Sequence, residues 1–250
     1  MKQIAVAGKG GVGKTTFTAL MLRYILKNKT GKTVLAVDAD PNANLNEALG
    51  LTVDNTISKM LEDTKIPNVV PTGMSKEMFI EYKLQDCLAE TNSYDLMVMG
   101  NPQKAGCYCY PNDLLRKHLE KLRVNYDYVI VDNEAGLEHL SRRIISEVDI
   151  LIVVSDASAR SIRSATRVHE IAKGVGLDIK EMCLVVTKVT GNEIAELQSE
   201  IDKTGLRLIG TVPLDPMVAE YDVKGLPLID LPDESAAVQA VNAILDKLNL

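Results

Sequence analysis

The stretch Gly8-Lys9-Gly10-Gly11-Val12-Gly13-Lys14-Thr15-Thr16 follows directly on the apolar run of residues 4–7. It satisfies the pattern G-x-x-x-x-G-K-[ST] of a phosphate-binding loop, and it stands between a predicted strand and a predicted helix, as that motif requires. Glycines let the backbone fold around a polyphosphate with its N–H groups pointing inward, and the helix that follows adds its positive end. The stretch therefore predicts a nucleoside triphosphate site.

Two side chains of this loop have predicted roles. Lys14 would reach the β- and γ-phosphates as a point charge, and the Thr15 hydroxyl would hold Mg²⁺. The alternative is a glycine-rich turn that binds nothing, which the strand before the loop and the helix after it disfavour.

Composition limits the classes of partner. The chain has 250 residues, 46% of them hydrophobic and 25% charged, with a formal net charge of -6. An acidic protein attracts neither nucleic acid nor an anionic membrane surface, and no apolar run approaches the ~20 residues of a membrane span. We therefore expect a cytoplasmic protein whose four cysteines are thiols, with no nucleic-acid or membrane partner.

The hydrophobic pattern alternates between strands and helices. Residues 15–28 have apolar positions at helical spacing, and buried strands are predicted near residues 2–7, 33–37, 95–100, 127–131, 149–154, 182–187 and 207–212. This alternation predicts an α/β fold with a parallel sheet covered by helices on both faces, in a single domain over residues 1–250. Residues 62–94 fit the pattern least well, although residues 74–79 could form a short helix.

Acidic residues follow two of these strands. Asp38 and Asp40 end the second strand, and Asp132 ends the strand near 127–131 in the manner of a Walker B motif. In an open α/β sheet, ligands bind at the carboxyl ends of the strands. Carboxylates at these positions suit Mg²⁺ and the positioning of a water molecule, whereas the alternative for the first pair is an Asp-Pro turn.

Cys107 and Cys109 lie in a loop framed by glycine and proline. Two thiolates two residues apart can bind one metal ion but supply only two of the four ligands that Zn²⁺ or square-planar Ni²⁺ takes. A homodimer with this loop on its two-fold axis would supply four. The alternative is a pair of incidental surface thiols; Cys87 and Cys183 are expected to be packing residues.

The lysine pair Lys9 and Lys14 in K-G-G-V-G-K-T resembles the deviant Walker A pattern of the ATPase family that includes nitrogenase iron protein, MinD and ParA. The resemblance implies that Lys9 crosses a dimer interface to the partner's nucleotide. The Cys-x-Cys loop and the string D-N-E-A-G-L-E-H-L-S-R-R, which starts at Asp132, further resemble the CooC family. These nickel-dependent ATPases mature carbon monoxide dehydrogenase, and close relatives act on acetyl-CoA synthase.

The resemblance also implies roles for single residues. Asp40 would activate water, Asp38 would contact Mg²⁺ through its water shell, and Gly136 would offer its N–H to the γ-phosphate. Thr187 and Lys188 stand where relatives carry asparagine followed by a basic residue on the adenine side. The second adenine-side segment is matched by Pro213 and Asp215.

Together these features predict a homodimeric metallochaperone that hydrolyses ATP to ADP and inserts nickel into carbon monoxide dehydrogenase or acetyl-CoA synthase. Lys9, Lys14 and Asp40 would be its catalytic residues. One alternative is an electron-transfer protein with a [4Fe–4S] cluster, like nitrogenase iron protein, although adjacent cysteines are unlike that family's separated ligands. The other is a ParA/MinD-type positioning ATPase, which the acidic charge disfavours.

Overall fold

The apolar runs pair into one sheet in the computed structural model, which describes residues 1–101, 109–133, 147–174 and 176–250 and, over 109–115, the backbone alone. The described strands are β1 (Lys2–Gly8), β2 (Val34–Asp38), β3 (Leu88–Glu90), β4 (Asp95–Val98), β5 (Tyr128–Asp132), β6 (Glu147–Asp156), β7 (Asp178–Val189) and β8 (Arg207–Pro213). Their order is β3-β4-β2-β5-β1-β6-β7-β8. The loop after β1 therefore lies in the middle of the row of strand ends.

The sheet is parallel apart from one edge. Every described pairing is parallel except that of β3 with β4. In β1, Ile4 and Val6 enter one core and Ala5 and Ala7 the other, and all four are fully buried. Strands buried on both faces are typical of parallel sheets, so the predicted α/β architecture is confirmed.

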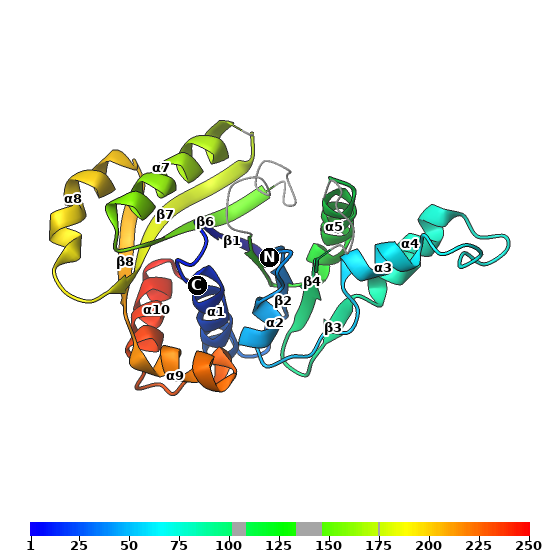
Figure 1. Ribbon diagram of the computed structural model, residues 1–250, viewed down its shortest axis with the longest axis horizontal. Coiled ribbons are helices and arrows are strands. Elements are labelled where there is room, and N and C mark those ends of the chain that lie inside the picture. Colours follow the sequence, from blue (N-terminus) through cyan, green and yellow to red (C-terminus); the bar gives the residue numbers. More distant parts are fainter. Residues whose placement is uncertain (102–108, 134–146, 175) are drawn as a thin grey trace.

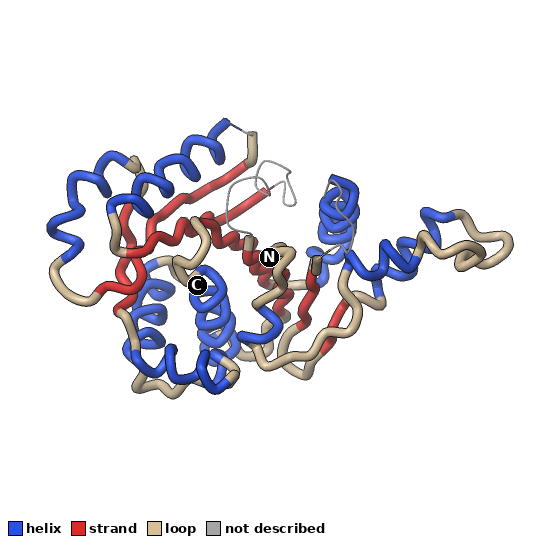
Figure 2. Tube along the Cα trace, viewed as in Figure 1, coloured by secondary structure: helices blue, strands red, loops and turns tan. Residues whose placement is uncertain are grey.

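Helices cover both faces of the sheet (Figures 1 and 2). The described helices are α1 (Lys14–Asn28), α2 (Leu45–Ala48), α3 (Ile57–Asp63), α4 (Lys76–Gln85), α5 (Cys109–Leu122), α7 (Ala159–Gly174), α8 (Glu193–Lys203), α9 (Pro216–Lys224) and α10 (Ala236–Lys247), with short 3₁₀ turns η1 (Arg123–Asn125) and η2 (Leu228–Asp230). Side chains of α1, α2 and α10 share one core, and those of α3, α4, α5, α7 and α8 share the other.

The segment that fits the sequence pattern least well forms an arm at the β3 edge. Helices α3 and α4 project from the body of the molecule (Figure 1), and β3 then adds antiparallel to β4. The two helices begin at side-chain caps, because Thr56 accepts from the Lys59 N–H and Ser75 from the Met78 N–H. The predicted short helix is thus part of α4, whereas α3 and β3 were not predicted.

Helix α5 starts three residues earlier than its apolar pattern indicates. The sequence predicts a start near Asn112, and the structure begins the helix at Cys109. Pro111 falls in the first turn, where a missing N–H breaks no helical hydrogen bond. The start of this helix therefore overlaps the Cys-x-Cys segment.

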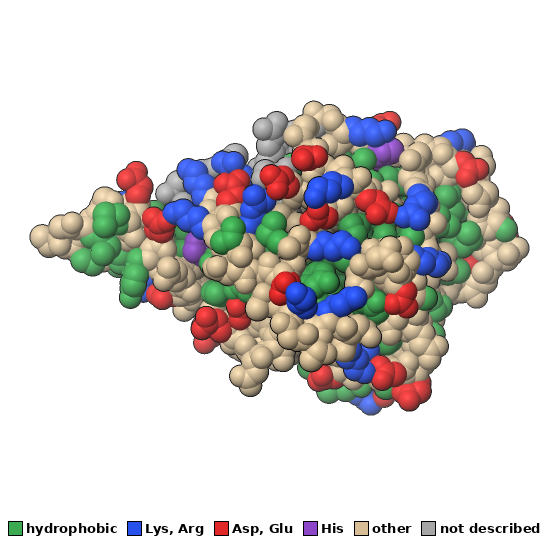
Figure 3. All heavy atoms as spheres, turned by 180° about the vertical axis from the view of Figure 1, so that it is seen from behind, with side chains coloured by type: hydrophobic (Ala, Val, Ile, Leu, Met, Phe, Trp, Pro, Cys, Tyr) green, Lys and Arg blue, Asp and Glu red, His purple; other side chains and the backbone are tan. Residues whose placement is uncertain are grey.

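The exterior mixes charges of both signs. On the face seen in Figure 3, Lys and Arg side chains are interspersed with Asp and Glu. Exposed ion pairs of this kind include Lys180 with Asp149 at 2.6 Å and Lys27 with Asp233 at 2.7 Å. Among the described residues, no helix is long and apolar enough to cross a membrane.

Candidate nucleotide site

The loop between β1 and α1 leaves the start of the helix open. Gly13 precedes α1 with φ 87°, and no side chain of the described residues caps this helix end. A Cβ on Gly13 would meet only the Thr187 hydroxyl oxygen, at 4.0 Å, so the positive φ selects glycine there. A Cβ on Gly8 would lie 2.2 Å from the Val154 carbonyl oxygen, so close pairing with β6 selects glycine here. Uncapped helical N–H groups bind phosphate.

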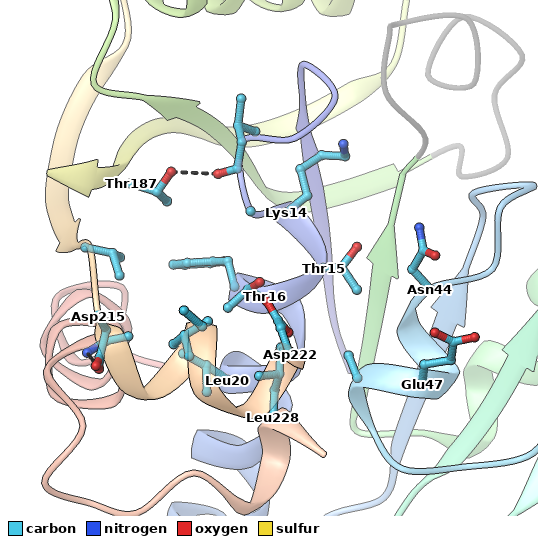
Figure 4. A pocket seen from close by; sticks show the side chains of 18 of the residues that line it. Lys14, Thr15, Thr16, Leu20, Asn44, Glu47, Thr187, Asp215, Asp222 and Leu228 are labelled. Atoms are coloured by element: carbon cyan, nitrogen blue, oxygen red, sulfur yellow. Dashed lines mark hydrogen bonds between the residues drawn. The ribbon is translucent and has the colours of Figure 1, made fainter. Parts of the chain in front are cut away.

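The two lysines of the loop have different surroundings. Lys14 is 7% exposed, and its Nζ donates to the Lys9 carbonyl oxygen at 3.3 Å, whereas the Lys9 side chain is exposed. Figure 4 shows Lys14 beside the loop at the top of α1. Lys14 thus places an ammonium beside the N–H groups at the start of α1, an arrangement that suits a polyphosphate.

A hydroxyl and a carboxylate meet at the start of α1. The Thr15 Oγ1 donates to Asp132 Oδ2 at 2.7 Å, and Asp132 is 1% exposed. Its Oδ1 is buried and has no hydrogen-bond partner among the described residues. Burial raises the pKa of Asp132 to about 6. A hydroxyl beside a carboxylate with a spare buried oxygen is a donor set that fits Mg²⁺, directly or through its water shell.

A second buried carboxylate lies on the neighbouring strand. Asp38 on β2 is paired in register with Asp132 on β5, and it is fully buried. Its two oxygens accept from the backbone N–H groups of Asp40 at 3.0 Å and Leu45 at 2.9 Å. Burial, and then the nearby Asp132 carboxylate, raise the pKa of Asp38 to about 7. Strand register therefore brings together Asp38 and Asp132, which the sequence predicts as separate magnesium-side carboxylates, and a nearby dication would relieve their repulsion.

Asp40 lies at the wall of the cavity rather than in the core. Its Oδ1 accepts from the Asn42 backbone N–H at 2.9 Å and from Asn42 Nδ2 at 3.0 Å. The sequence Asp-Pro-Asn thus does form a local turn, as the alternative interpretation has it. Asp40 also lines the cavity that contains the loop.

A cavity of about 1020 Å³ runs from the loop along the flank of α1 (Figure 4). Its polar end is made by loop residues 10–16, and its apolar end lies under α9 between α2 and α10. That apolar end includes Phe17, Leu20, Leu51, Val218, Leu228 and Val241. Ligand pockets commonly hold about 300–1,000 Å³, so the space suffices for a complete nucleotide.

The predicted adenine-side residues gather at one wall of this cavity. Thr187, Lys188, Pro213 and Asp215 all line it. The Asp215 carboxylate, however, accepts from Met217 N at 2.9 Å, and its other oxygen accepts from the Ser235 hydroxyl and Ala237 N. It thereby holds the first turns of two helices, α9 and α10.

Part of the predicted site lies outside the described residues. Cys107 and Gly136 are not described, and Cys109 is described only as the first backbone position of α5. Within the described part of the chain, no group of three or more His, Cys, Asp or Glu is arranged to hold a metal ion. Cys87 and Cys183 are buried, and burial raises the pKa of each thiol to about 12, as expected of packing residues.

Sequence reasoning missed several polar residues of the cavity, among them Asn44, Glu47 and Asp222. Asn44 and Glu47 come from the start of α2 and its first turn, and Asp222 comes from α9 (Figure 4). Asn44 follows Asp40 by four residues, and this short distance from the end of β2 could have identified it. Glu47 and Asp222 belong to no motif, because only the tertiary placement of α2 and α9 brings them to the cavity.

A loop of this geometry, with buried acids on two neighbouring strand ends, defines a P-loop nucleotide-binding protein. The AAA_31 family, described as an AAA domain, matches residues 1–183. The chain therefore belongs to this family of P-loop ATP-binding proteins of the MinD/ParA type.

Two relatives match nearly the whole chain. An uncharacterized ATP-binding protein of Methanocaldococcus jannaschii is 40% identical over 248 residues, 98% of this chain and 97% of the relative. The carbon monoxide dehydrogenase accessory protein CooC of Rhodospirillum rubrum is 31% identical, over 98% of this chain and 97% of CooC. The crystal structure of the Pyrococcus furiosus cell division ATPase MinD has a TM-score of 0.72 and 23% identity, covering 99% of this chain and 98% of MinD, which shows the shared fold.

Proposed function

We propose that this protein is a homodimeric ATPase that carries nickel and delivers it to carbon monoxide dehydrogenase or acetyl-CoA synthase. The observation that carries the proposal is the similarity to CooC along nearly the whole chain, and the sequence adds the Cys-x-Cys pair of Cys107 and Cys109. Zn²⁺ competes for the same thiolates, so nickel is proposed because of the similarity to CooC and not because of the ligand type.

Hydrolysis is assigned to the polar end of the cavity. Lys14 and the uncapped start of α1 bind the phosphates, and Asp40 orients the attacking water from the cavity wall. Thr15 and Asp132, with Asp38 behind them, hold Mg²⁺, which supplies charge stabilisation at the phosphates. Gly136 is proposed to bind the γ-phosphate through its N–H.

Dimerisation is assigned to Lys9 and to the segment that contains Cys107 and Cys109. Lys9 is exposed beside the phosphate site, where it can reach a nucleotide held by a second copy. Two cysteines per subunit leave a metal ion two ligands short, and a two-fold axis at the loop completes the set. Pro213 and Asp215 lie at the wall proposed for adenine.

The buried cysteines favour the metal assignment to Cys107 and Cys109. Cys87 and Cys183 each pack among apolar side chains, one in each core of the sheet. The proposal therefore treats these two as packing residues and assigns the metal site to the other pair.

Anaerobic Ni²⁺ titration of the full-length protein tests the metal site. The double variant Cys107→Ser, Cys109→Ser should lose binding of about one ion per dimer and keep its nucleotide affinity. Cys87→Ala is the matched control, and it should bind nickel like the unaltered protein. Unchanged stoichiometry in the double variant would show that the metal site lies elsewhere.

Phosphate release under Mg²⁺-ATP tests the catalytic assignment. Asp40→Asn should lower kcat by about 100-fold or more and keep nucleotide affinity, because the amide cannot serve as a base. Lys14→Ala should lose affinity as well, since it removes the charge that faces the phosphates. Retained turnover in the Asp40 variant would move the water-orienting role to another residue.

A positioning ATPase of the MinD/ParA type is the second candidate, favoured by the fold shared with MinD. It predicts ATP-dependent binding to DNA or to anionic lipid vesicles that weakens with salt. Sedimentation with vesicles containing phosphatidylserine, and a mobility shift with duplex DNA, separate the two candidates. Binding in either assay together with no nickel affinity would replace the metallochaperone proposal.

A further inference from the structure

Two consecutive side chains at the end of β7 hold two consecutive carbonyl groups of the phosphate-binding loop. The Thr187 hydroxyl donates to the Val12 carbonyl oxygen at 2.6 Å, a bond drawn in Figure 4. The Lys188 Nζ donates to the Gly11 carbonyl oxygen at 2.7 Å. The end of β7 thus contacts the backbone of the loop at two successive peptide units.

These two contacts fix the direction of two loop N–H groups. In a planar trans peptide, the C=O of one residue and the N–H of the next point in opposite directions. Holding the carbonyls of Gly11 and Val12 toward β7 therefore turns the N–H groups of Val12 and Gly13 away from it. A carbonyl that accepts a hydrogen bond also polarises its own amide, which makes the attached N–H a better donor.

The local backbone at the end of β7 is arranged for these contacts. The pairing of β7 with β8 shifts register between Val186 and Val189. Lys188 adopts φ 57°, a left-handed conformation that costs a non-glycine residue about 1 kcal/mol or more and persists only where its surroundings require it. The conformation coincides with the Lys188 contact to the loop.

The Thr187 hydroxyl is committed to backbone groups. The residue is 5% exposed, and besides Val12 its hydroxyl also lies 3.1 Å from the Ser155 carbonyl oxygen at the end of β6. Val12 is fully buried. If the Thr187 hydroxyl turned toward a base, the Val12 carbonyl would lose this hydrogen bond, which costs free energy at a buried position. The hydroxyl is therefore unsuited to reading an adenine edge.

We propose that Thr187 and Lys188 are positioning residues that hold the phosphate-binding loop in its binding conformation, and that they do not read the base. The proposal rests on nucleotide binding at this loop and is independent of nickel. Its consequence is that both residues support any ligand with a polyphosphate, whatever base it carries.

Displacement of a fluorescent ADP analogue tests this with three ligands: ADP, GDP and inorganic tripolyphosphate. Thr187→Val keeps the shape of the side chain and removes the hydroxyl, so all three affinities should fall by a similar factor of about five to ten. Thr187→Ser should restore them. Lys188→Met should weaken all three by about two- to threefold, because its ammonium is exposed.

Thr190→Val is the matched control. It makes the same substitution three residues further along, where the hydroxyl contacts Glu193 at the surface, and it should leave all three affinities unchanged. Loss of ADP affinity with unchanged tripolyphosphate affinity in Thr187→Val would overturn the proposal in favour of base contact. Unchanged affinities for all three ligands would also overturn the proposal. If the Thr187 variant does not fold, the affinities of Lys188→Met for the same three ligands decide between these outcomes. If the unaltered protein does not bind the fluorescent ADP analogue, the proposed nucleotide site itself is wrong.

Discussion

At the scale of the residue, the site is built around two carboxylates that the fold buries side by side. Asp38 and Asp132 are opposite one another on β2 and β5, with pKa values raised to about 7 and about 6, mainly by burial. Each is held by neighbours, Asp132 by the Thr15 hydroxyl and Asp38 by two backbone N–H groups. Without a cation, their ionisation opposes folding, and a bound Mg²⁺ would reverse that effect.

This predicts an unusual pH dependence of stability in the nucleotide-free and magnesium-free protein. The folded pKa of Asp38 lies above the ordinary aspartate value of 3.8, so the folded state binds more protons than the unfolded state between about pH 4 and 7. The free energy of unfolding should therefore fall as the pH rises from about 4 to 7. Ionisation of Asp38 should account for roughly 2–4 kcal/mol of this decrease in the free energy of unfolding.

Urea denaturation at a series of pH values, on the unaltered protein and on Asp38→Asn, measures this contribution of Asp38. The variant should have a clearly flatter profile, although its absolute stability drops because an amide nitrogen cannot accept a backbone hydrogen bond. Profiles of equal steepness would show that Asp38 does not titrate in this range.

At the scale of the element, the wall of the cavity depends on one carboxylate. Asp215 accepts from Met217 N of α9 and from Ser235 Oγ and Ala237 N at the start of α10. Helix α9 has no fully buried residue of its own, so this anchor matters more for it than for α10, which packs five buried side chains into the core. The segment that follows β8 is thereby tied to the starts of α9 and α10.

Asp215→Ala should lower the free energy of unfolding by about 2–3 kcal/mol, because it removes the caps of two helices at once. Asp222→Ala, on the exposed surface of α9, should change it by about 0.5 kcal/mol or less. Urea denaturation compares the two. Equal effects would mean that α9 and α10 are held by packing alone.

At the scale of the whole molecule, the proposed function requires two copies. The phosphate site lies in the middle of the row of strand ends, and Lys9 is exposed there while Lys14 is buried. An exposed lysine that contacts a nucleotide in the partner contributes to association, whereas the buried lysine contributes to nucleotide affinity within one subunit.

Lys9→Ala should therefore weaken ATP-dependent dimerisation by about tenfold and change nucleotide affinity much less. Light scattering over a range of protein concentrations, with and without ATP, measures the dimerisation. Lys203→Ala, on the exposed face of α8, is the control and should dimerise normally. A Lys9 variant that dimerises like the control would assign the interface to other residues.

The amino-acid sequence by itself determined the class of fold and the nucleotide loop. Both depend on residues that are contiguous or regularly spaced: the glycines and the two lysines of residues 8–16, the buried apolar runs, and the acids that end two of them. In the irregular arm the sequence indicated only part of α4. It did not predict α3 and β3, because these two elements are short and are ordered by a side-chain cap and by pairing with β4.

Only the tertiary structure decided how distant residues share the site. Strand order places Asp38 opposite Asp132, and the end of β7 brings the Thr187 hydroxyl to Val12, 175 positions away in the sequence. The same packing turns Asp215 into an anchor for two helices. Contacts of this kind depend on register and packing across the sheet, which a local pattern of residue types does not specify.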